Sequence, residues 1–186
     1  MTSPQVFTAP AFLDGFTCRR IQRAMDAGIT EPAEILERGI ERDDDVRRAS
    51  SVEIGARLTD DVERRLDALR DTIGAYFGLE LTGREGASFL RYDEGGFYKP
   101  HRDRGDLPEW PGAARRQVAV AVFLNSSRAV DRRGDFSGGA LEVDTGGEPI
   151  RVEPVRGLLV AFPADLLHEV LTVTEGTRDT IVDWYY

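Results

Sequence analysis

The two histidines of this chain, His101 and His168, are the residues best suited to bind a metal ion. His101 stands two residues before Asp103, and alternate residues of an extended segment point the same way, so both side chains face one point. His168 follows a predicted strand at 158–162 and can add a ligand from across a barrel. Two imidazoles and one carboxylate leave open metal positions, as in Fe(II) oxygenases. Taken alone, a histidine at position 168 would more often be an ordinary packed residue, and a single His-x-Asp is a weak motif.

Arg178 lies ten residues after His168, and residues 175–176 between them predict a hairpin turn. With the turn centred there, Arg178 pairs with Thr172, and the pairing preserves side-chain parity. The face shared with the metal then comprises His168, Val170, Thr172, Arg178, Thr180, Val182 and Trp184.

A guanidinium on this face is suited to hold a small diacid, because it can bind a carboxylate through two parallel hydrogen bonds. The alternative is a surface ion pair between Arg178 and Asp179 or Asp183. Side-chain parity argues against it, since both aspartates face away from Arg178.

The elements that position these residues are predicted helices in the first half of the chain and predicted strands in the second. Helices are expected from a Thr17 cap to about Ala27, from Thr30 to Gly39, and from about Asp60 to Phe77, where Gly78 ends the last one. Short β-rich runs follow at Ala87–Tyr92, Gln117–Leu124, Ala140–Val143, Gly157–Phe162, His168–Thr172 and Thr177–Trp184.

This order predicts one α+β domain over residues 1–186, with a double-stranded β-helix, or jelly roll, as its core. Residues 1–78 would be mainly helical support outside the barrel, and 79–186 the jelly-roll core. The run Val118–Phe123 is apolar on both faces, so we expect a central strand covered on one side by the long helix.

Composition excludes several classes of function. The 33 acidic and 24 basic residues give a net charge of −9, which disfavours nucleic acid and anionic membrane as partners. Apolar runs are too short to span a membrane and no cationic leader opens the chain, so we expect a cytoplasmic protein. Cys18 is the single cysteine, which excludes a cysteine metal cage and suits a core position.

The second half of the chain resembles the prolyl 4-hydroxylase-like branch of the Fe(II)- and 2-oxoglutarate-dependent dioxygenases. The resemblance spans roughly Phe89 to Trp184 and is carried by Tyr92, Gly95, Tyr98, His101, Asp103, Phe123-Leu124-Asn125, Gly138-Gly139-Ala140-Leu141, Gly157, Phe162, His168, Val170, Val173, Gly176, Arg178 and Trp184. It implies that His101, Asp103 and His168 bind Fe(II), and that Arg178 and Tyr92 hold the distal carboxylate of 2-oxoglutarate.

The resemblance implies that O2 and 2-oxoglutarate are consumed, with ascorbate as a possible reductant, to hydroxylate a C–H bond. Asp103 favours hydroxylation over halogenation, and Trp184 stands where the nucleic-acid branch would carry a second arginine. Many animal collagen enzymes carry lysine where Arg178 stands. A prolyl residue in a peptide or protein is the first expected substrate, and a free amino acid or small metabolite is the second. The residues are also compatible with a cupin-like metal-binding module and with a 2-oxoglutarate or oxygen sensor.

Two polar loops, 104–116 and 126–137, are long enough to be lids over the substrate, although solvated connections are the alternative for each. We expect the substrate contacts to come from these loops and the inner wall, namely Trp110, Arg128, Arg132, Arg133, Trp184 and Tyr98. The arginines favour a substrate with a carboxylate or acidic neighbours. The oligomeric state is left open.

Overall fold

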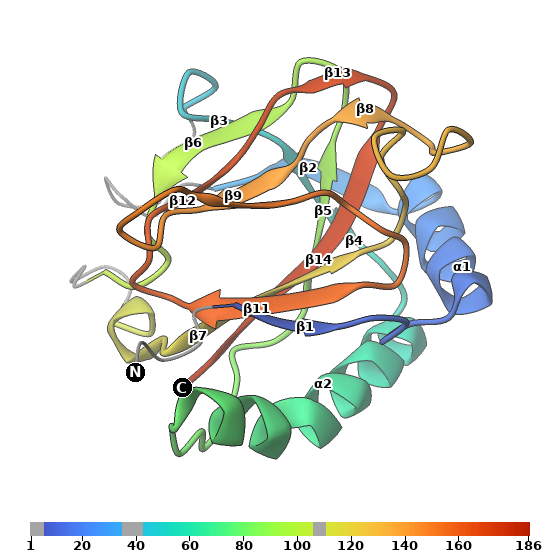
Figure 1. The fold of residues 1–186 in the computed structure, drawn as a ribbon. Helices are drawn as coiled ribbons and strands as arrows, with labels where there is room; N and C mark the ends of the chain where they lie inside the picture. The colour runs from blue at the N-terminus through green and yellow to red at the C-terminus, as the bar shows by residue number, and fades with distance from the viewer. Residues whose placement is uncertain (1–5, 35–42, 106–110) are drawn as a thin grey trace.

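Two antiparallel sheets face each other in the computed structural model, which describes residues 6–34, 43–105 and 111–186 (Figure 1). The larger sheet comprises, in spatial order, β1 (Phe7–Ala9), β11 (Leu159–Pro163), β7 (Val118–Phe123), β14 (Arg178–Tyr185), β5 (Ser88–Tyr92), β4 (Ser50–Glu53) and β2 (Ile29–Pro32). The smaller sheet comprises β10 (Ile150–Val152), β9 (Leu141–Val143), β12 (His168–Val170), β6 (Phe97–His101) and β3 (Arg47–Arg48). A short pair, β8 (Ser137–Gly138) and β13 (Val173–Glu175), completes the jelly roll.

Helices α1 (Gly15–Asp26) and α2 (Ala56–Phe77) lie outside the larger sheet, and a 3-10 turn spans Ala113–Arg115 (Figure 1). Strand β7 explains this arrangement, because all six of its residues are buried. Val120 and Val122 pack in one cluster with Leu66 of α2, whereas Ala119 and Phe123 face the space between the sheets. The prediction of a central strand covered by the long helix is confirmed.

The predicted start of the first helix was wrong by three residues. Asp14, not Thr17, is the N-cap of α1: its carboxylate accepts hydrogen bonds from the backbone of Phe16 and Thr17 at 2.9 and 2.8 Å. Asp14 precedes the helix and can satisfy its first free N–H groups, which a residue inside the first turn cannot do. The end of α2 at Gly78 agrees with the prediction, since this residue adopts the left-handed conformation.

The predicted helix from Thr30 is also wrong in its described part. Residues Ile29–Pro32 form β2, an edge strand that pairs with β4, and residues 35–42 lie outside the described residues. Proline suits an edge strand because its missing N–H can face solvent there. Together with β1, β3 and β4, this strand shows that residues 1–78 contribute to both sheets as well as supplying the two helices.

The predicted pairing of Arg178 with Thr172 is wrong, although the predicted parity of β14 holds. β13 pairs with β8, and β14 crosses to the larger sheet, where it runs between β7 and β5. Arg178 and His168 therefore stand on facing sheets rather than on one hairpin.

No helix among the described residues is long and apolar enough to cross a membrane.

Candidate metal centre and binding cavity

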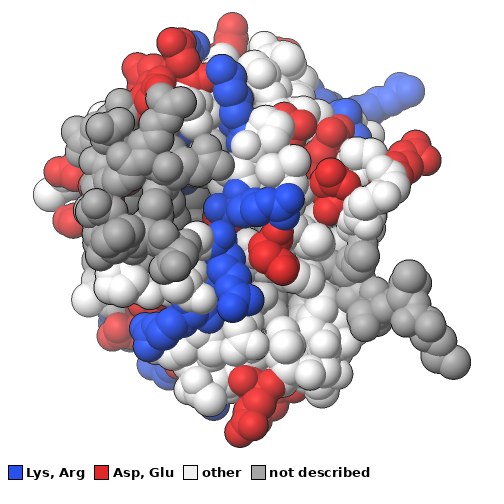
Figure 2. All heavy atoms as spheres, turned by 90° about the vertical axis from the view of Figure 1, so that its left-hand side faces the viewer, with Lys and Arg blue, Asp and Glu red and all other residues white. Residues whose placement is uncertain are grey.

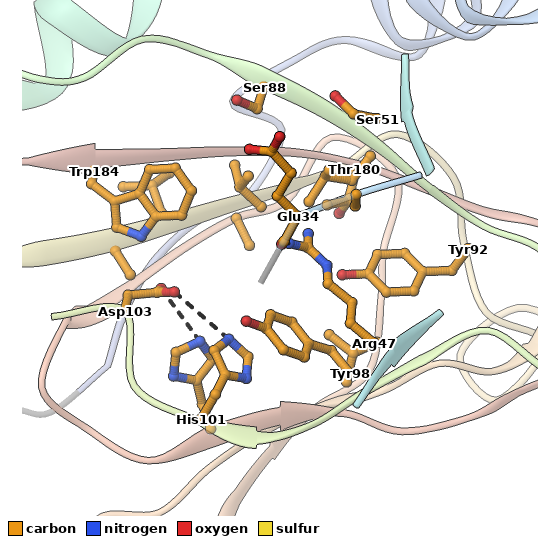
Figure 3. Close-up of a pocket in the computed structure, with 18 of the residues that line it drawn as sticks. Glu34, Arg47, Ser51, Ser88, Tyr92, Tyr98, His101, Asp103, Thr180 and Trp184 are labelled. Atoms are coloured by element: carbon orange, nitrogen blue, oxygen red, sulfur yellow. Dashed lines mark hydrogen bonds and ion pairs between the residues drawn. The ribbon is translucent and has the colours of Figure 1, made fainter. Parts of the chain in front are cut away.

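A cavity of about 450 Å³ lies between the two sheets and holds the predicted metal ligands (Figure 3). Its walls include the inward residues of β14, which are Arg178, Thr180, Val182 and Trp184. Tyr92 and Tyr98 line it from β5 and β6. The inward parity of β14 thus places Arg178 in the same cavity as His101, Asp103 and His168.

The three candidate ligands converge at the edge of the smaller sheet. His101 ends β6 and His168 begins β12, and the two are directly paired across these strands. Asp103 follows two residues after His101, and its carboxylate oxygens lie 3.6 Å from Nε2 of His101 and 3.3 Å from Nε2 of His168. One ligand atom from each residue lies within 4.8 Å of the others, and all three residues are buried.

Backbone carbonyls orient both imidazole rings. Nδ1 of His101 lies 2.9 Å from the carbonyl oxygen of Lys99, and Nδ1 of His168 lies 3.0 Å from that of Leu166. A carbonyl only accepts hydrogen bonds, so each Nδ1 carries a proton, and Nε2, which faces Asp103, is the ring atom that can bind a metal when the ring is neutral. With both rings neutral, two Nε2 atoms and a carboxylate oxygen converge in one buried place, where a bound cation would compensate the buried charge of Asp103. This donor set fits a divalent metal such as Fe(II).

Burial and mutual charge shift the three pKa values. Burial lowers the pKa of His101. Burial opposes the charged form of His168 as well, but the charge and hydrogen bond of Asp103 outweigh it and raise that pKa. Burial would raise the pKa of Asp103, yet His168 and the hydrogen bonds of both imidazoles hold it well below its usual range. Asp103 is thus ready to bind a metal as a carboxylate at neutral pH.

Arg178 is a buried cation without a carboxylate partner among the described residues. Arg178 is the first residue of β14 and is 1% exposed. Its Nε and Nη1 atoms lack a hydrogen-bond partner among the described residues. Burial lowers its pKa, and interaction with Tyr92 counters part of that effect. The guanidinium carbon lies 4.9 Å from the ring centre of Tyr92 and 5.2 Å from that of Phe123. Unpaired donors on a buried charge are costly, so the site is built for an anion.

A family model described as the 2OG-Fe(II) oxygenase superfamily matches residues 87–186, more than half of the chain. The chain belongs to this superfamily. The match covers the candidate metal ligands and Arg178, and it confirms the family resemblance drawn from the sequence.

Curated relatives of the chain are bacterial PKHD-type hydroxylases. The one from Sphingopyxis alaskensis is 34% identical over 88 residues, which are 47% of this chain and 38% of the relative. The one from Acaryochloris marina is 34% identical over 96 residues, or 52% of this chain and 39% of the relative. The aligned part thus spans about two fifths of the length of each relative.

Solved structures of other superfamily members agree with the fold. A Pseudomonas putida prolyl-4-hydroxylase is 26% identical, with a TM-score of 0.73 over 97% of this chain and 91% of that one. A prolyl hydroxylase from Trichoplax adhaerens, solved with a hypoxia inducible factor peptide, has a TM-score of 0.80 at 18% identity and covers 100% of this chain and 84% of that one. The second likeness supports the fold alone.

Trp184 and Tyr98, two of the predicted substrate contacts, line the cavity of this superfamily member, whereas the three loop arginines do not. None of Arg128, Arg132 and Arg133 lines the cavity, and Arg128 forms an ion pair with Glu175 at 2.5 Å instead. The sequence could not reveal this, because a loop's length does not fix the side on which it folds. Trp110 lies outside the described residues, as do 106–109 of the other loop.

The cavity wall contains a buried ion pair, Arg116 with Glu85, that the sequence did not predict. Arg116 is 1% exposed, binds both carboxylate oxygens of Glu85 at 2.7 Å and donates to the backbone carbonyl of Asp103 at 3.1 Å. Its guanidinium carbon lies 3.8 Å from the ring centre of Trp184. Arg116 belongs to the 104–116 loop, so part of that loop is wall rather than lid.

Proposed function

We propose that this chain is an Fe(II)- and 2-oxoglutarate-dependent hydroxylase that acts on a C–H bond of a prolyl or other amino-acid residue. The observation that carries the proposal is the buried guanidinium of Arg178, whose Nε and Nη1 lack a hydrogen-bond partner among the described residues, in the same cavity as the His101, Asp103 and His168 cluster. A metal site alone suits many functions, whereas a metal site beside a buried cation that lacks a carboxylate partner among the described residues suits a chelating diacid.

In this proposal His101, Asp103 and His168 would hold Fe(II), and three protein ligands would leave room for the cosubstrate and O2. Arg178 binds the distal carboxylate of 2-oxoglutarate through its free donors, and the Tyr92 phenol donates to the same group. When bound, iron and 2-oxoglutarate supply the oxidation: one O2 gives one oxygen atom to succinate, formed as CO2 leaves, and the other to the hydroxyl group of the product.

The remaining wall residues position the reactants and exclude water. Phe162 packs edge-on against the His168 ring at 4.7 Å between ring centres, and Tyr98 stacks on the His101 ring at 3.4 Å. These contacts fix the planes of both imidazoles and thereby the positions of their Nε2 atoms. Holding the substrate C–H bond beside the metal site is the protein's main contribution to rate.

A prolyl residue remains the first proposed substrate, because the structural neighbours include proteins named prolyl hydroxylases and the curated relatives are named hydroxylases. A free amino acid or small metabolite is the second. A cupin-like binding module has no use for Arg178, and a 2-oxoglutarate or oxygen sensor would bind without turnover. A single domain over 1–186, a cytoplasmic location, ascorbate as reductant and the absence of a nucleic-acid partner also remain proposals.

The experiment is hydroxylation under ¹⁸O2. The chain is incubated with Fe(II), 2-oxoglutarate and a panel of prolyl peptides and free amino acids, and products are analysed by mass spectrometry. We expect one ¹⁸O atom in the product and one in succinate, in equal amounts. Arg178→Met should abolish both labels, whereas Arg48→Gln, on the outer side of β3, should keep both. Unlabelled product, or product formed without 2-oxoglutarate, contradicts the proposal.

A further inference from the structure

The cavity contains a second arginine, Arg47, that has a buried donor without a partner among the described residues. Among the described residues, three arginines line the cavity: Arg47, Arg116 and Arg178. Glu85 neutralises Arg116 through two hydrogen bonds, and the proposed function assigns Arg178 to the cosubstrate. Arg47 alone of the three is left for another ligand.

Arg47 forms no ion pair with any described carboxylate. Its Nη1 donates to the backbone carbonyl of Glu34 at 2.6 Å, and its Nε is buried without a hydrogen-bond partner. Figure 3 shows the guanidinium beside Tyr98 and the carboxylate of Glu34, another cavity residue, pointing away from that guanidinium. A guanidinium has five N–H donors, and the Nε–H of Arg47 is a donor that no described residue accepts.

A stack of flat groups links Arg47 to the metal centre. Arg47 pairs with Tyr98 across β3 and β6, and its guanidinium carbon lies 4.6 Å from the centre of the Tyr98 ring. Tyr98 in turn stacks on His101, with ring centres 3.4 Å apart and planes 17° from parallel. The ring holds one face of the guanidinium and leaves its edge, which carries the donors, directed at the cavity.

Only the Tyr98 ring separates the Arg47 guanidinium from the His101 ring, so one substrate can contact Arg47 and lie beside the metal site. Neighbouring Cα atoms of a peptide are about 3.8 Å apart, so the reacting carbon and a carboxylate at Arg47 can belong to one amino acid or to two adjacent residues. The surface charge at this end of the barrel also favours an anionic substrate. Figure 2 views the end of the barrel where β6 ends, and it shows a band of Lys and Arg side chains there although the chain carries a net charge of −9.

We infer that Arg47 is a specificity residue that binds a carboxylate of the primary substrate, close to the carbon that is hydroxylated. This inference rests on the proposed function and names the substrate class for it. The carboxylate comes either from the amino acid that is hydroxylated or from an acidic residue next to it.

Calorimetry with matched probes tests the inference. The chain is loaded with Zn(II), which is redox-inert, and with saturating 2-oxoglutarate, which keeps Arg178 occupied. The probes are acetyl-proline against acetyl-prolinamide, and acetyl-Pro-Asp-amide against acetyl-Pro-Asn-amide. We expect the carboxylate member of one pair to bind about tenfold tighter, as a charge-assisted hydrogen bond provides. The pair that shows the preference identifies the source of the carboxylate.

Arg47→Gln should remove the preference and Arg47→Lys should keep part of it. Arg48→Gln is the matched control, because Arg48 is the next residue of β3, is exposed, and lies over Phe97 at 5.6 Å instead of lining the cavity. Equal binding within both pairs, no binding of any probe, or a preference that survives in Arg47→Gln overturns the inference. If 2-oxoglutarate itself fails to bind, the proposed function fails; if it binds and the preference is absent, only this inference fails.

Discussion

Arg178 and Tyr92 stand directly opposite each other on β14 and β5, and both are buried, with 1% and 2% of their surfaces exposed. The guanidinium carbon lies 4.9 Å from the phenol ring centre. The Tyr92 ring supplies π-electron density but no negative charge, so it does not neutralise the buried charge of Arg178. The folded protein therefore carries a cost at this position that ligand binding can remove.

Replacing Arg178 with methionine should stabilise the ligand-free protein while abolishing its response to 2-oxoglutarate. The buried unsatisfied donors cost about 1–3 kcal/mol, and methionine removes them at similar volume. Thermal unfolding with and without 2-oxoglutarate and Zn(II) measures both effects. Arg91→Met is the control of opposite sign, because Arg91 binds the buried Asp179 at 2.7 Å and its loss leaves that carboxylate unpaired. A ligand-induced rise in melting temperature that persists in Arg178→Met contradicts the assignment.

His101→Ala and His168→Ala should each weaken Zn(II) or Fe(II) binding by more than about 100-fold. Loss of groups that only support metal ligands already costs 10–100-fold, and these residues supply the ligand atoms. Asp103→Ala should keep weak binding through the two imidazoles and lose hydroxylation. Calorimetric titration with each metal gives the affinities, with Asp165→Ala as a control outside the cluster. Unchanged affinity in either histidine variant would place the metal elsewhere.

Gly139→Ala should displace the side chain of Arg178. A Cβ atom at this position would lie 2.9 Å from Cδ of Arg178, and the backbone has φ +67°. The matched control is Gly146→Ala, where φ is +84° and nothing lies within 4 Å of the added carbon. Both variants should lose about 1–2 kcal/mol of stability from backbone strain. Only Gly139→Ala should also raise the dissociation constant of 2-oxoglutarate; equal constants in the two variants would disprove the contact.

The thiol of Cys18 should resist alkylation in the native protein. Cys18 is completely buried in α1, and burial raises its pKa to about 11, so little thiolate forms at neutral pH. Modification by iodoacetamide should proceed only at the rate of global unfolding, and denaturant should accelerate it steeply. Since Cys18 is the chain's single cysteine, mass spectrometry of the intact protein reports this site alone. Rapid labelling in buffer would show that α1 opens locally.

Side-chain alternation was the strongest predictor of the cavity. It placed Arg178 and Trp184 inward and Asp179 outward, where Asp179 binds Arg91. It succeeded even though the predicted hairpin was wrong, because parity along one strand does not depend on which strand is its neighbour. The partner strand depends on long-range pairing, which local sequence does not encode.

The position of Arg47 in the cavity could not be predicted from the sequence. It belongs to a strand of two residues, too short for any periodicity, and it follows the charged segment 41–45. Its place in the cavity depends on pairing with Tyr98, more than fifty residues later. Arg116 was hidden for a similar reason, since its buried partner Glu85 lies in a separate connection.

The most direct test of the central claim is succinate formation from 2-oxoglutarate in air, measured with and without Fe(II) and with the probe peptides and amino acids. The account predicts Fe(II)- and O2-dependent succinate, released with an equal amount of CO2, increased by a carboxylate-bearing substrate. It should be absent in His168→Ala and Arg178→Met and retained in Arg48→Gln. If wild-type protein binds both Fe(II) and 2-oxoglutarate yet forms no succinate with any probe, the chain is a binding protein and the account is wrong.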